Sequence, residues 1–203
     1  TGSSCGMGLA MERQPCNPGV LPLCIARHAS AELQAHAAAQ GAALTQWEAD
    51  LGAPEAVAAR LRTWLQAQDP SQLAGAALLN NAGRIGRLGE LAPHDAADIA
   101  QTLRLNLEAP IHLAAAFLEA TRGWTLPRRI LNISSGLGRR AMAGRRRALV
   151  CASFSRRRTI SCAKDCGRSR AATRSSLDCA ARVLATSAAF KRSAARSKRC
   201  CGI

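Results

Sequence analysis

The chain has 203 residues and a mass of 21.3 kDa, with 48% hydrophobic residues, which suits a single globular domain and argues against two independent cores. Its 28 basic and 13 acidic residues give a net charge of +15 and an isoelectric point near 11.0. Tyrosine is absent, which excludes any mechanism that requires a phenol as proton donor.

The positive charge is concentrated in the last third of the chain. Residues 1–140 hold 12 Arg, no Lys and 11 acids, whereas residues 141–203 hold 16 basic residues and two acids, a net charge of +14. All eight Pro precede this boundary, and six of the nine Cys follow it. We therefore divide the chain into a first part, residues 1–144, and a basic segment, residues 145–203.

The first part alternates between helix and strand patterns. After a strand-like LCIA at 23–26, residues 30–41 predict a short helix with Ser30 as its N-cap and Gly41 just past its end. A strand that runs into a turn is expected over 43–51, and an apolar stripe predicts an amphipathic helix over 54–69.

Two buried strands and one long helical region complete this pattern. The apolar run at 75–80 ends in a turn-forming Asn-Asn-Ala-Gly, and the run at 129–134 ends in Ser-Ser-Gly. Between them, residues 96–120 predict a helix that is bent or interrupted at Pro110. The alternation favours an α/β fold, a Rossmann-type doubly wound parallel sheet.

Four motifs occur in order along residues 1–144: TGSSCGMG (1–8), NNAG (80–83), Asn106 within LRLNLEAP, and NISSG (132–136). Together they resemble the short-chain dehydrogenase/reductase family, whose members transfer hydride between a nicotinamide cofactor and a carbonyl or alcohol. The glycines of the first motif would let a strand-to-helix turn approach a dinucleotide pyrophosphate without a Cβ in the way, and would aim helix N–H groups at its charge.

The resemblance implies a set of cofactor-binding residues. Asp50 and Leu51 would contact the adenine, and Asn81, Ala82 and Gly83 would line the side of the adenine ribose. From the first motif, the residues expected to bind the cofactor are Gly2, Ser4, Gly6, Met7 and Gly8.

Arg27 follows a strand at the place where family members that use the unphosphorylated cofactor carry an acid. A guanidinium there would pair with a ribose 2′-phosphate, so we expect NADP(H) to be preferred over NAD(H). Cys5 stands where many relatives that prefer NADP(H) have a second Arg, and this departure weakens the argument.

The resemblance supplies half of a catalytic site. Ser135 matches the serine that hydrogen-bonds the substrate oxygen, and Asn106 matches the asparagine that kinks its helix and holds a water in the proton relay. The family's Tyr-x-x-x-Lys is missing, because its two positions fall on Ala148 and Ala152 in one alignment and on Val150 and Phe154 in another. We expect a very poor oxidoreductase, since the matched acid and the cation that tunes its pKa are both absent.

Two further departures concern the fold. The chain starts at Thr1, where the family's central first strand would end, so the strands on either side are expected to lack a partner. Pro15 and Pro18 fall where a helix should follow Gly8, and Pro22 falls in an expected inner strand; both are unfavourable places for proline.

The basic segment, residues 145–203, admits three interpretations. Its Arg, Ala, Ser and Cys content is typical of GC-rich coding DNA translated out of frame, which would explain the abrupt change inside a motif. A segment of this charge could instead bind nucleic acid, although it offers few aromatic side chains for stacking. It could also be a solvated or partly helical surface segment or be disordered, with a thin apolar stripe over 176–190.

The remaining expectations concern location, metals and partners. No apolar run is long enough to cross a membrane and no secretory signal opens the chain, so we expect a cytoplasmic protein that does not bind membranes. The Cys and His residues lack metal-site spacing, and we expect no metal. A small carbonyl or alcohol is the expected substrate, and the sequence does not define an oligomeric state.

Overall fold

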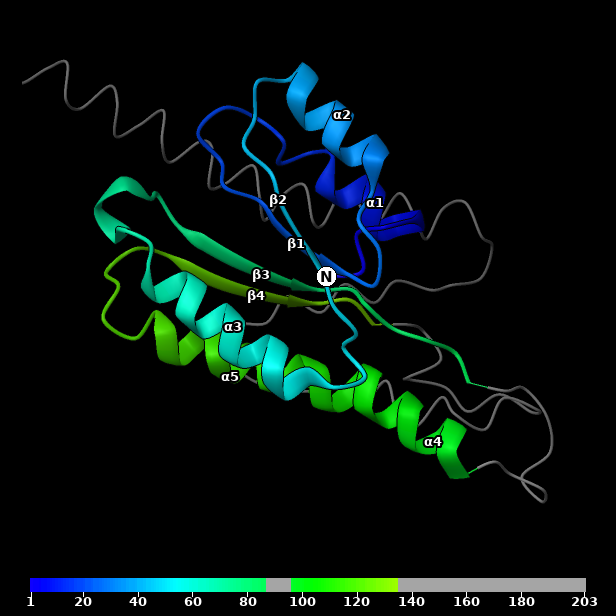
Figure 1. Ribbon diagram of the computed structural model, residues 1–203. Helices are drawn as coiled ribbons and strands as arrows, with labels where there is room; N and C mark the ends of the chain where they lie inside the picture. The colour runs from blue at the N-terminus through cyan, green and yellow to red at the C-terminus, as the bar shows by residue number, and fades with distance from the viewer. Residues whose placement is uncertain (87–95, 135–203) are drawn as a thin grey trace, which may run out of the picture.

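A computed structural model describes residues 1–86 and 96–134 of the chain (Figure 1). In these ranges the strands are β1 (Leu23–Ala26), β2 (Thr45–Glu48), β3 (Ala76–Asn80) and β4 (Arg128–Asn132). The α-helices are α1 (Gly6–Glu12), α2 (Ala31–Ala39), α3 (Pro54–Gln66), α4 (Ala96–Leu103) and α5 (Ala109–Ala120). A 3₁₀ turn, η1 (Pro70–Gln72), precedes β3, and a π-helical turn, η2 (Arg104–Glu108), joins α4 to α5.

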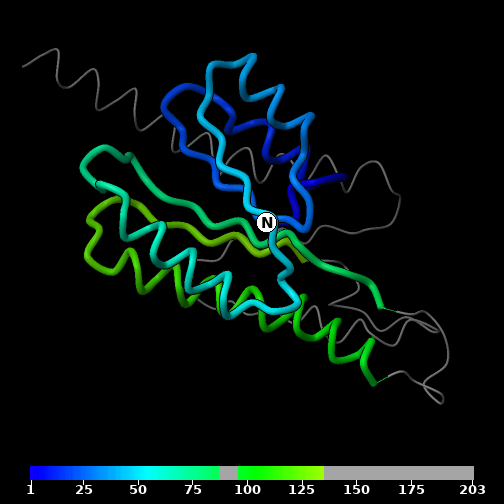
Figure 2. Tube along the Cα trace, in the orientation of Figure 1, coloured from blue at the N-terminus to red at the C-terminus, as the bar shows by residue number. Residues whose placement is uncertain are grey.

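The four strands form two separate parallel pairs. β1 pairs with β2, beginning at Leu23 opposite Thr45, and β3 pairs with β4, beginning at Ala76 opposite Arg128. Each pair is a two-stranded sheet of its own. The expected parallel α/β architecture is confirmed, and the strands that flank the start of the chain do not pair with each other. The trace in Figure 2 places Thr1 between the two strand pairs.

Helices cover both sides of the strands, as expected for a doubly wound arrangement. In Figure 1, α1 and α2 lie on one side, and α3 and α5 lie on the other. Alternate side chains of a strand point to opposite faces. Cys24 of β1 therefore packs with Leu33 and Ala37 of α2, whereas its neighbour Ile25 joins the cluster formed by α3 and α5.

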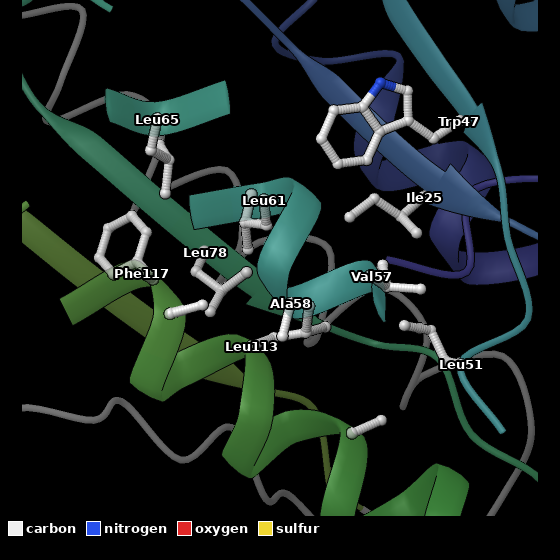
Figure 3. Close-up of a cluster of buried hydrophobic side chains, with 12 residues drawn as sticks. Ile25, Trp47, Leu51, Val57, Ala58, Leu61, Leu65, Leu78, Leu113 and Phe117 are labelled. Carbon is white, nitrogen blue, oxygen red and sulfur yellow. The ribbon is translucent and has the colours of Figure 1, made fainter. Parts of the chain in front are cut away.

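The largest hydrophobic cluster lies under α3 and α5 and draws on both strand pairs (Figure 3). Leu113 is 1% exposed and Phe117 is 3% exposed, and they contact residues of α3 such as Leu61 within the same cluster. Burying one such side chain contributes about 1.5–3 kcal/mol. The full set of buried members is Ile25, Trp47, Leu51, Val57, Ala58, Leu61, Leu65, Leu78, Ala109, Leu113, Ala116 and Phe117.

Most of the predicted elements occur where the sequence places them. Ser30 caps α2 by accepting a hydrogen bond from the Leu33 N–H at 3.2 Å, and Gly41 follows the helix with φ of +61°. Pro54 lies in the first turn of α3, where a missing N–H has no cost, although this helix ends at Gln66 rather than Asp69.

The structure bears on three expectations that concern prolines. α1 is only seven residues long and ends at Glu12, before Pro15 and Pro18, so neither proline interrupts a helix. Pro22 precedes β1 instead of lying within it, and its carbonyl accepts the Thr45 N–H at 3.0 Å. The long helical region is interrupted by η2, which ends at Glu108, two residues before Pro110, and Pro110 lies in the first turn of α5.

Within residues 1–86 and 96–134, no helix combines the length and the apolar character that crossing a membrane requires.

Candidate functional site

The carboxyl ends of β1 and β3 lie on either side of the start of the chain, which bonds to both strands. β1 ends at Ala26 and β3 ends at Asn80, and Thr1 and Gly2 lie between these two ends. Ligands of open α/β sheets bind at this edge, at the point where the chain changes direction across the sheet. The predicted site residues described by the structure come from the loops and helix starts near this edge.

The glycines of the first motif fill positions that other residues could not occupy. Gly2 and Gly6 have φ of +69° and +57°, in the left-handed region that side chains disfavour. At Gly8 the constraint is space, since a Cβ would lie 1.8 Å from the Gly2 carbonyl oxygen and 2.7 Å from Nδ2 of Asn81. The turn therefore packs its backbone directly against the loop after β3.

Thr1 and Asn81 tie the glycine turn to the end of β3. The Thr1 hydroxyl accepts hydrogen bonds from the backbone N–H groups of Asn81 and Ala82, both at 3.0 Å. Asn81 in turn donates through Nδ2 to the Thr1 carbonyl at 3.2 Å. Asn81 is thus held from both its backbone and its side chain, and the predicted cofactor residues Asn81 and Ala82 lie beside Gly2.

Ser4 and Met7 lie within the same turn and helix start. Ser4 is half-buried, and Met7, on α1, packs partly into the small cluster around Met11 and Leu131. Exposed Cys5 occupies the N-cap of α1 but its side chain makes no capping hydrogen bond. The first N–H groups of α1 are therefore left without a side-chain cap.

Arg27 extends from the carboxyl end of β1. Its side chain is exposed and forms no ion pair with any residue in the described ranges. A guanidinium without an acidic partner at this edge is available to an anionic group.

Asp50 and Leu51 follow the end of β2 but differ in environment. Asp50 is exposed and accepts the Gly52 N–H at 2.8 Å, which shapes the turn. Leu51 is only 4% exposed, and its side chain belongs to the main hydrophobic cluster. The Leu51 side chain is therefore a member of the protein core, and its predicted contact with the adenine is not tested by the structure.

Asn106 lies in the π-helical turn η2, and its side chain hydrogen-bonds to the backbone of Arg84. Its Oδ1 accepts the Arg84 N–H at 2.9 Å, and its Nδ2 donates to the Arg84 carbonyl at 2.8 Å. The loop passes close to it, because a Cβ on Gly83 would lie 3.3 Å from Oδ1. Asn106 therefore joins the widened helix to the same loop that carries Asn81 and Ala82.

Sequence reasoning did not select Thr1 or Arg84 as parts of the site. Thr1 opens the first motif, so the motif itself carried a signal that its hydroxyl matters. Arg84 gives no such signal, yet its guanidinium bonds to Asp98 at 2.6 Å and to Gln101, both on α4. This contact fixes α4 against the loop that Asn106 holds.

Asn80 and Asn132 pair across the carboxyl ends of β3 and β4, with Nδ2 of Asn80 donating to Oδ1 of Asn132 at 2.9 Å. The chain then leads through Ser134 to Ser135, the predicted catalytic serine. Ser135, the positions expected for Tyr-x-x-x-Lys and the basic segment all lie outside the described residues.

Two buried thiols lie behind the site rather than in it. Burial and the nearby Glu12 carboxylate raise the pKa of Cys24 to about 12, and the same two causes raise the pKa of Cys16. Both thiols are therefore protonated and inert at neutral pH. No group of three metal-ligating side chains occurs in the part of the chain that the structure describes.

Comparison with known proteins gives the same family as the motifs. The short chain dehydrogenase family profile matches residues 1–147. A benzil reductase ((S)-benzoin forming) from Bacillus cereus is 24% identical over 144 residues, which cover 71% of this chain and 58% of that protein. The chain thus spans little more than half the length of this relative.

Solved structures agree on the fold. A short-chain dehydrogenase/reductase from Burkholderia vietnamiensis has 28% identity and a TM-score of 0.64, covering 83% of this chain and 82% of that one. A metagenomic short-chain oxidoreductase in complex with NADP also has 28% identity, with a TM-score of 0.63 and coverage of 73% and 65%.

The parallel strands, the helices on both faces and the glycine turn at the carboxyl edge define a Rossmann-type protein. The family match over most of the chain makes the assignment specific: this chain belongs to the short chain dehydrogenase family.

Proposed function

We propose that residues 1–144 form the dinucleotide-binding part of an oxidoreductase that transfers hydride between a nicotinamide cofactor and a small carbonyl or alcohol. NADP(H) is the preferred cofactor in this proposal, and the cytoplasm is its location. Support comes from the family match and from the NADP complex of the metagenomic relative.

The observation that carries the proposal is the contact at Gly8. A Cβ at Gly8 would lie 1.8 Å from the Gly2 carbonyl oxygen, and a Cβ at Gly2 would lie 3.0 Å from the Cα of Ala82, so the turn approaches the loop after β3 closely at both glycines. Arg27, which is exposed and has no ion pair within residues 1–86 and 96–134, lies at the end of β1. A glycine-lined turn beside this guanidinium fits a phosphorylated dinucleotide, because the backbone can approach the diphosphate while the guanidinium meets the 2′-phosphate.

When bound, the nicotinamide would supply or accept the hydride. In our proposal Arg27 binds the 2′-phosphate, and Asn81 and Ala82 line the ribose. Asn106 holds the loop at Arg84 in place, and a water in its widened helix turn would belong to the proton relay. Ser135 would donate a hydrogen bond to the substrate oxygen, where negative charge develops.

Turnover is impaired in this proposal because the family's Tyr-x-x-x-Lys pair, which supplies the acid and tunes its pKa, is missing. The whole sequence lacks tyrosine, and its first lysine is Lys164. General acid–base catalysis contributes roughly 10²- to 10⁴-fold to rate, and this contribution is lost. Binding of the cofactor and catalysis are therefore separable properties of this chain.

The binding test compares NADPH and NADH by calorimetry on the intact chain and on Arg27→Ala. A charged hydrogen bond contributes about 1.5–3 kcal/mol, so the variant should bind NADPH at least about 10-fold more weakly, with little change for NADH. Arg122→Ala is the matched control, because Arg122 is equally exposed but lies before β4, at the opposite edge. Equal losses in both variants, or no binding of either cofactor to the intact chain, would contradict the proposal.

The catalytic test restores the missing pair in each alignment. Val150→Tyr with Phe154→Lys and Ala148→Tyr with Ala152→Lys are assayed for NADPH-dependent reduction of a small ketone. We expect one double variant to gain roughly 10²-fold or more over the intact chain. Typical enzyme activity in the unmodified chain would refute the proposed impairment.

A second candidate function, nucleic-acid binding, is supported by the charge of the basic segment. Its +14 would attract phosphates, and binding would weaken steeply as salt increases. The test is a salt-dependent mobility shift of RNA or DNA by the intact chain that disappears on deletion of residues 145–203. A shift that survives the deletion would exclude the basic segment as the binding element.

A further inference from the structure

The loop between β1 and α2 is held at both of its ends. At one end, the carbonyl of Ala26, the last residue of β1, accepts the Ala49 N–H at 2.8 Å, so the pairing with the β2 side continues up to the start of the loop. At the other end, Ser30 is the N-cap of α2 and is only 8% exposed. The exposed residues 27–29, which begin with Arg27, lie between these two fixed points.

Gln46 of β2 holds Ser30 through both polar groups of the Ser30 backbone. The Ser30 N–H donates to Oε1 of Gln46 at 2.8 Å, and Nε2 of Gln46 donates to the Ser30 carbonyl at 3.2 Å. One side-chain amide thus satisfies the donor and the acceptor of a single residue, as a neighbouring strand would. Nε2 also donates to Oε1 of Gln34, an exposed residue of α2, at 3.3 Å. The two bonds to Ser30 join β2 to the loop that carries Arg27.

The pairing of β1 with β2 explains why Gln46 reaches this loop. Gln46 lies opposite Cys24 in the parallel register, so the two side chains lie on the same face of the strand pair. That face carries α2, because Cys24 and Leu33 belong to one buried cluster (Figure 1). The Gln46 side chain therefore extends toward the N-terminal end of α2, where Ser30 lies.

The start of α2 has bonds of its own that do not involve Gln46. The Ser30 hydroxyl accepts the Leu33 N–H at 3.2 Å, and the Ser30 carbonyl also accepts the Gln34 N–H at 3.1 Å. These bonds cap the helix and close its first turn. Loss of the Gln46 amide would leave them in place and would release the loop from β2. The contact thus acts on the position of the loop rather than on the formation of the helix.

The position of this loop determines where the Arg27 guanidinium lies. Arg27 is exposed and has no ion pair within residues 1–86 and 96–134, so no acidic side chain in these ranges orients it. A long side chain loses conformational freedom when it binds an anion, and this loss lowers the affinity. A backbone that is already fixed reduces the loss, because fewer bonds remain to be ordered on binding.

We propose that Gln46 is a positioning residue for recognition of the cofactor's 2′-phosphate: by fixing Ser30 against β2, it holds the loop of Arg27 in place for the anion. The inference rests on the proposed function, in which Arg27 binds the 2′-phosphate of NADP(H). Gln46 itself makes no contact with the cofactor in this proposal and acts only through Arg27. Its loss should therefore weaken binding of NADPH but not of NADH, which has no 2′-phosphate.

The experiment replaces Gln46 by Met, which has a similar length but no amide, and measures NADPH and NADH binding to the full chain by calorimetry. Gln34→Met is the matched control, because it removes the third bond of Gln46 and leaves both bonds to Ser30. We expect Gln46→Met to weaken NADPH binding about 3- to 10-fold, while NADH binding and the Gln34 variant stay unchanged. In an Arg27→Ala background, Gln46→Met should have no further effect on NADPH binding.

The urea midpoint of each variant is measured in parallel, and Gln46→Ala takes the place of the Met variant if the latter does not fold. Equal weakening of NADPH and NADH binding would overturn the inference, because it would indicate a general loosening of the site. An effect of the same size in the Arg27→Ala background would overturn it as well, since Gln46 would then not act through Arg27.

The remaining outcomes separate this inference from the proposed function. If Arg27→Ala weakens NADPH binding but Gln46→Met does not, the positioning role is overturned and the proposed function stands. If Arg27→Ala leaves NADPH binding unchanged, the proposed role of Arg27 and the inference built on it are both overturned.

Discussion

Gly8→Ala tests whether the glycine turn is as tightly packed as the structure indicates. The new methyl group would start 1.8 Å from the Gly2 carbonyl oxygen, and real Cβ contacts do not fall below 3.0 Å. The carbonyl must therefore retreat by more than ~1 Å, since close-packed backbone cannot absorb such an overlap. That movement pulls on the adjacent Gly2 N–H, which donates to Ile25 at 2.8 Å.

The expected magnitude follows from three contributions. Overpacking costs about 1–3 kcal/mol and a weakened hydrogen bond about 1 kcal/mol. The higher helix propensity of Ala offsets about 1 kcal/mol of this. The net loss is about 2 kcal/mol, which is roughly a 30-fold change in the folding equilibrium and a fall in Tm of about 4–8 °C.

The assay is urea denaturation followed by tryptophan fluorescence, with NADPH titration in parallel. Gly123→Ala is the control, because a Cβ at Gly123 meets nothing within 4 Å, and its stability should stay within about 0.5 kcal/mol of the parent chain. We expect NADPH affinity to fall only in the Gly8 variant. If the two variants had the same stability and affinity, the close approach of the turn to its own backbone would be refuted.

Three further predictions concern the same region and the buried thiols. Thr1→Val should lower the free energy of unfolding in urea by about 1–3 kcal/mol, because two backbone N–H groups lose their acceptor. Thr1→Ser keeps the hydroxyl and should lower it by less than about 1 kcal/mol; similar losses in the two variants would rule out the hydroxyl as the cause. Asn106→Ala should cost about 1–3 kcal/mol in urea denaturation, because the Arg84 N–H and carbonyl both lose their partner. Asn106→Asp should also be destabilising, because its carboxylate keeps the acceptor but faces the Arg84 carbonyl; an Ala variant as stable as the parent chain would contradict the contact. Cys24, whose pKa is raised to about 12, should resist iodoacetamide at pH 8 while exposed Cys5 reacts, as measured by peptide mapping; equal labelling of both thiols would refute the burial of Cys24. The free energy of unfolding should also fall as pH rises above about 9, because only the thiol of the unfolded chain ionises in that range.

The sequence predicted elements whose signals are local. Ser30 and Gly41 bracket α2 because a cap and a left-handed residue act on adjacent backbone groups. The stripe of α3 and the apolar runs of β3 and β4 were likewise readable, since burial follows the period of each element. Capping and periodicity require no knowledge of distant residues.

Contacts between segments that are distant in the chain could not be predicted from the sequence. Asn106, in the π-helical turn η2, bonds to Arg84, 22 residues earlier in the chain, and no local pattern predicts this contact. For the candidate site, the glycine pattern predicted a tight turn leading into a helix, but the close approach of Gly8 to Gly2 is known only from the structure. The burial of Leu51 in the core could not be inferred, because an apolar residue in a turn can face either the protein or a ligand.

The main hydrophobic cluster holds the two strand pairs together through side chains. In the described ranges, Thr1 and Gly2 supply the backbone bridge between the strand pairs, whereas α3 and α5 clamp side chains from both pairs. On the opposite face, β1 and α2 pack in a smaller cluster formed by Cys16, Cys24, Leu33 and Ala37. Under mild denaturant the unit formed by β1, β2 and α2 should unfold first, so the amides of α2 should exchange before those of α5. The packing of the helices, rather than a continuous sheet, then sets the order of unfolding.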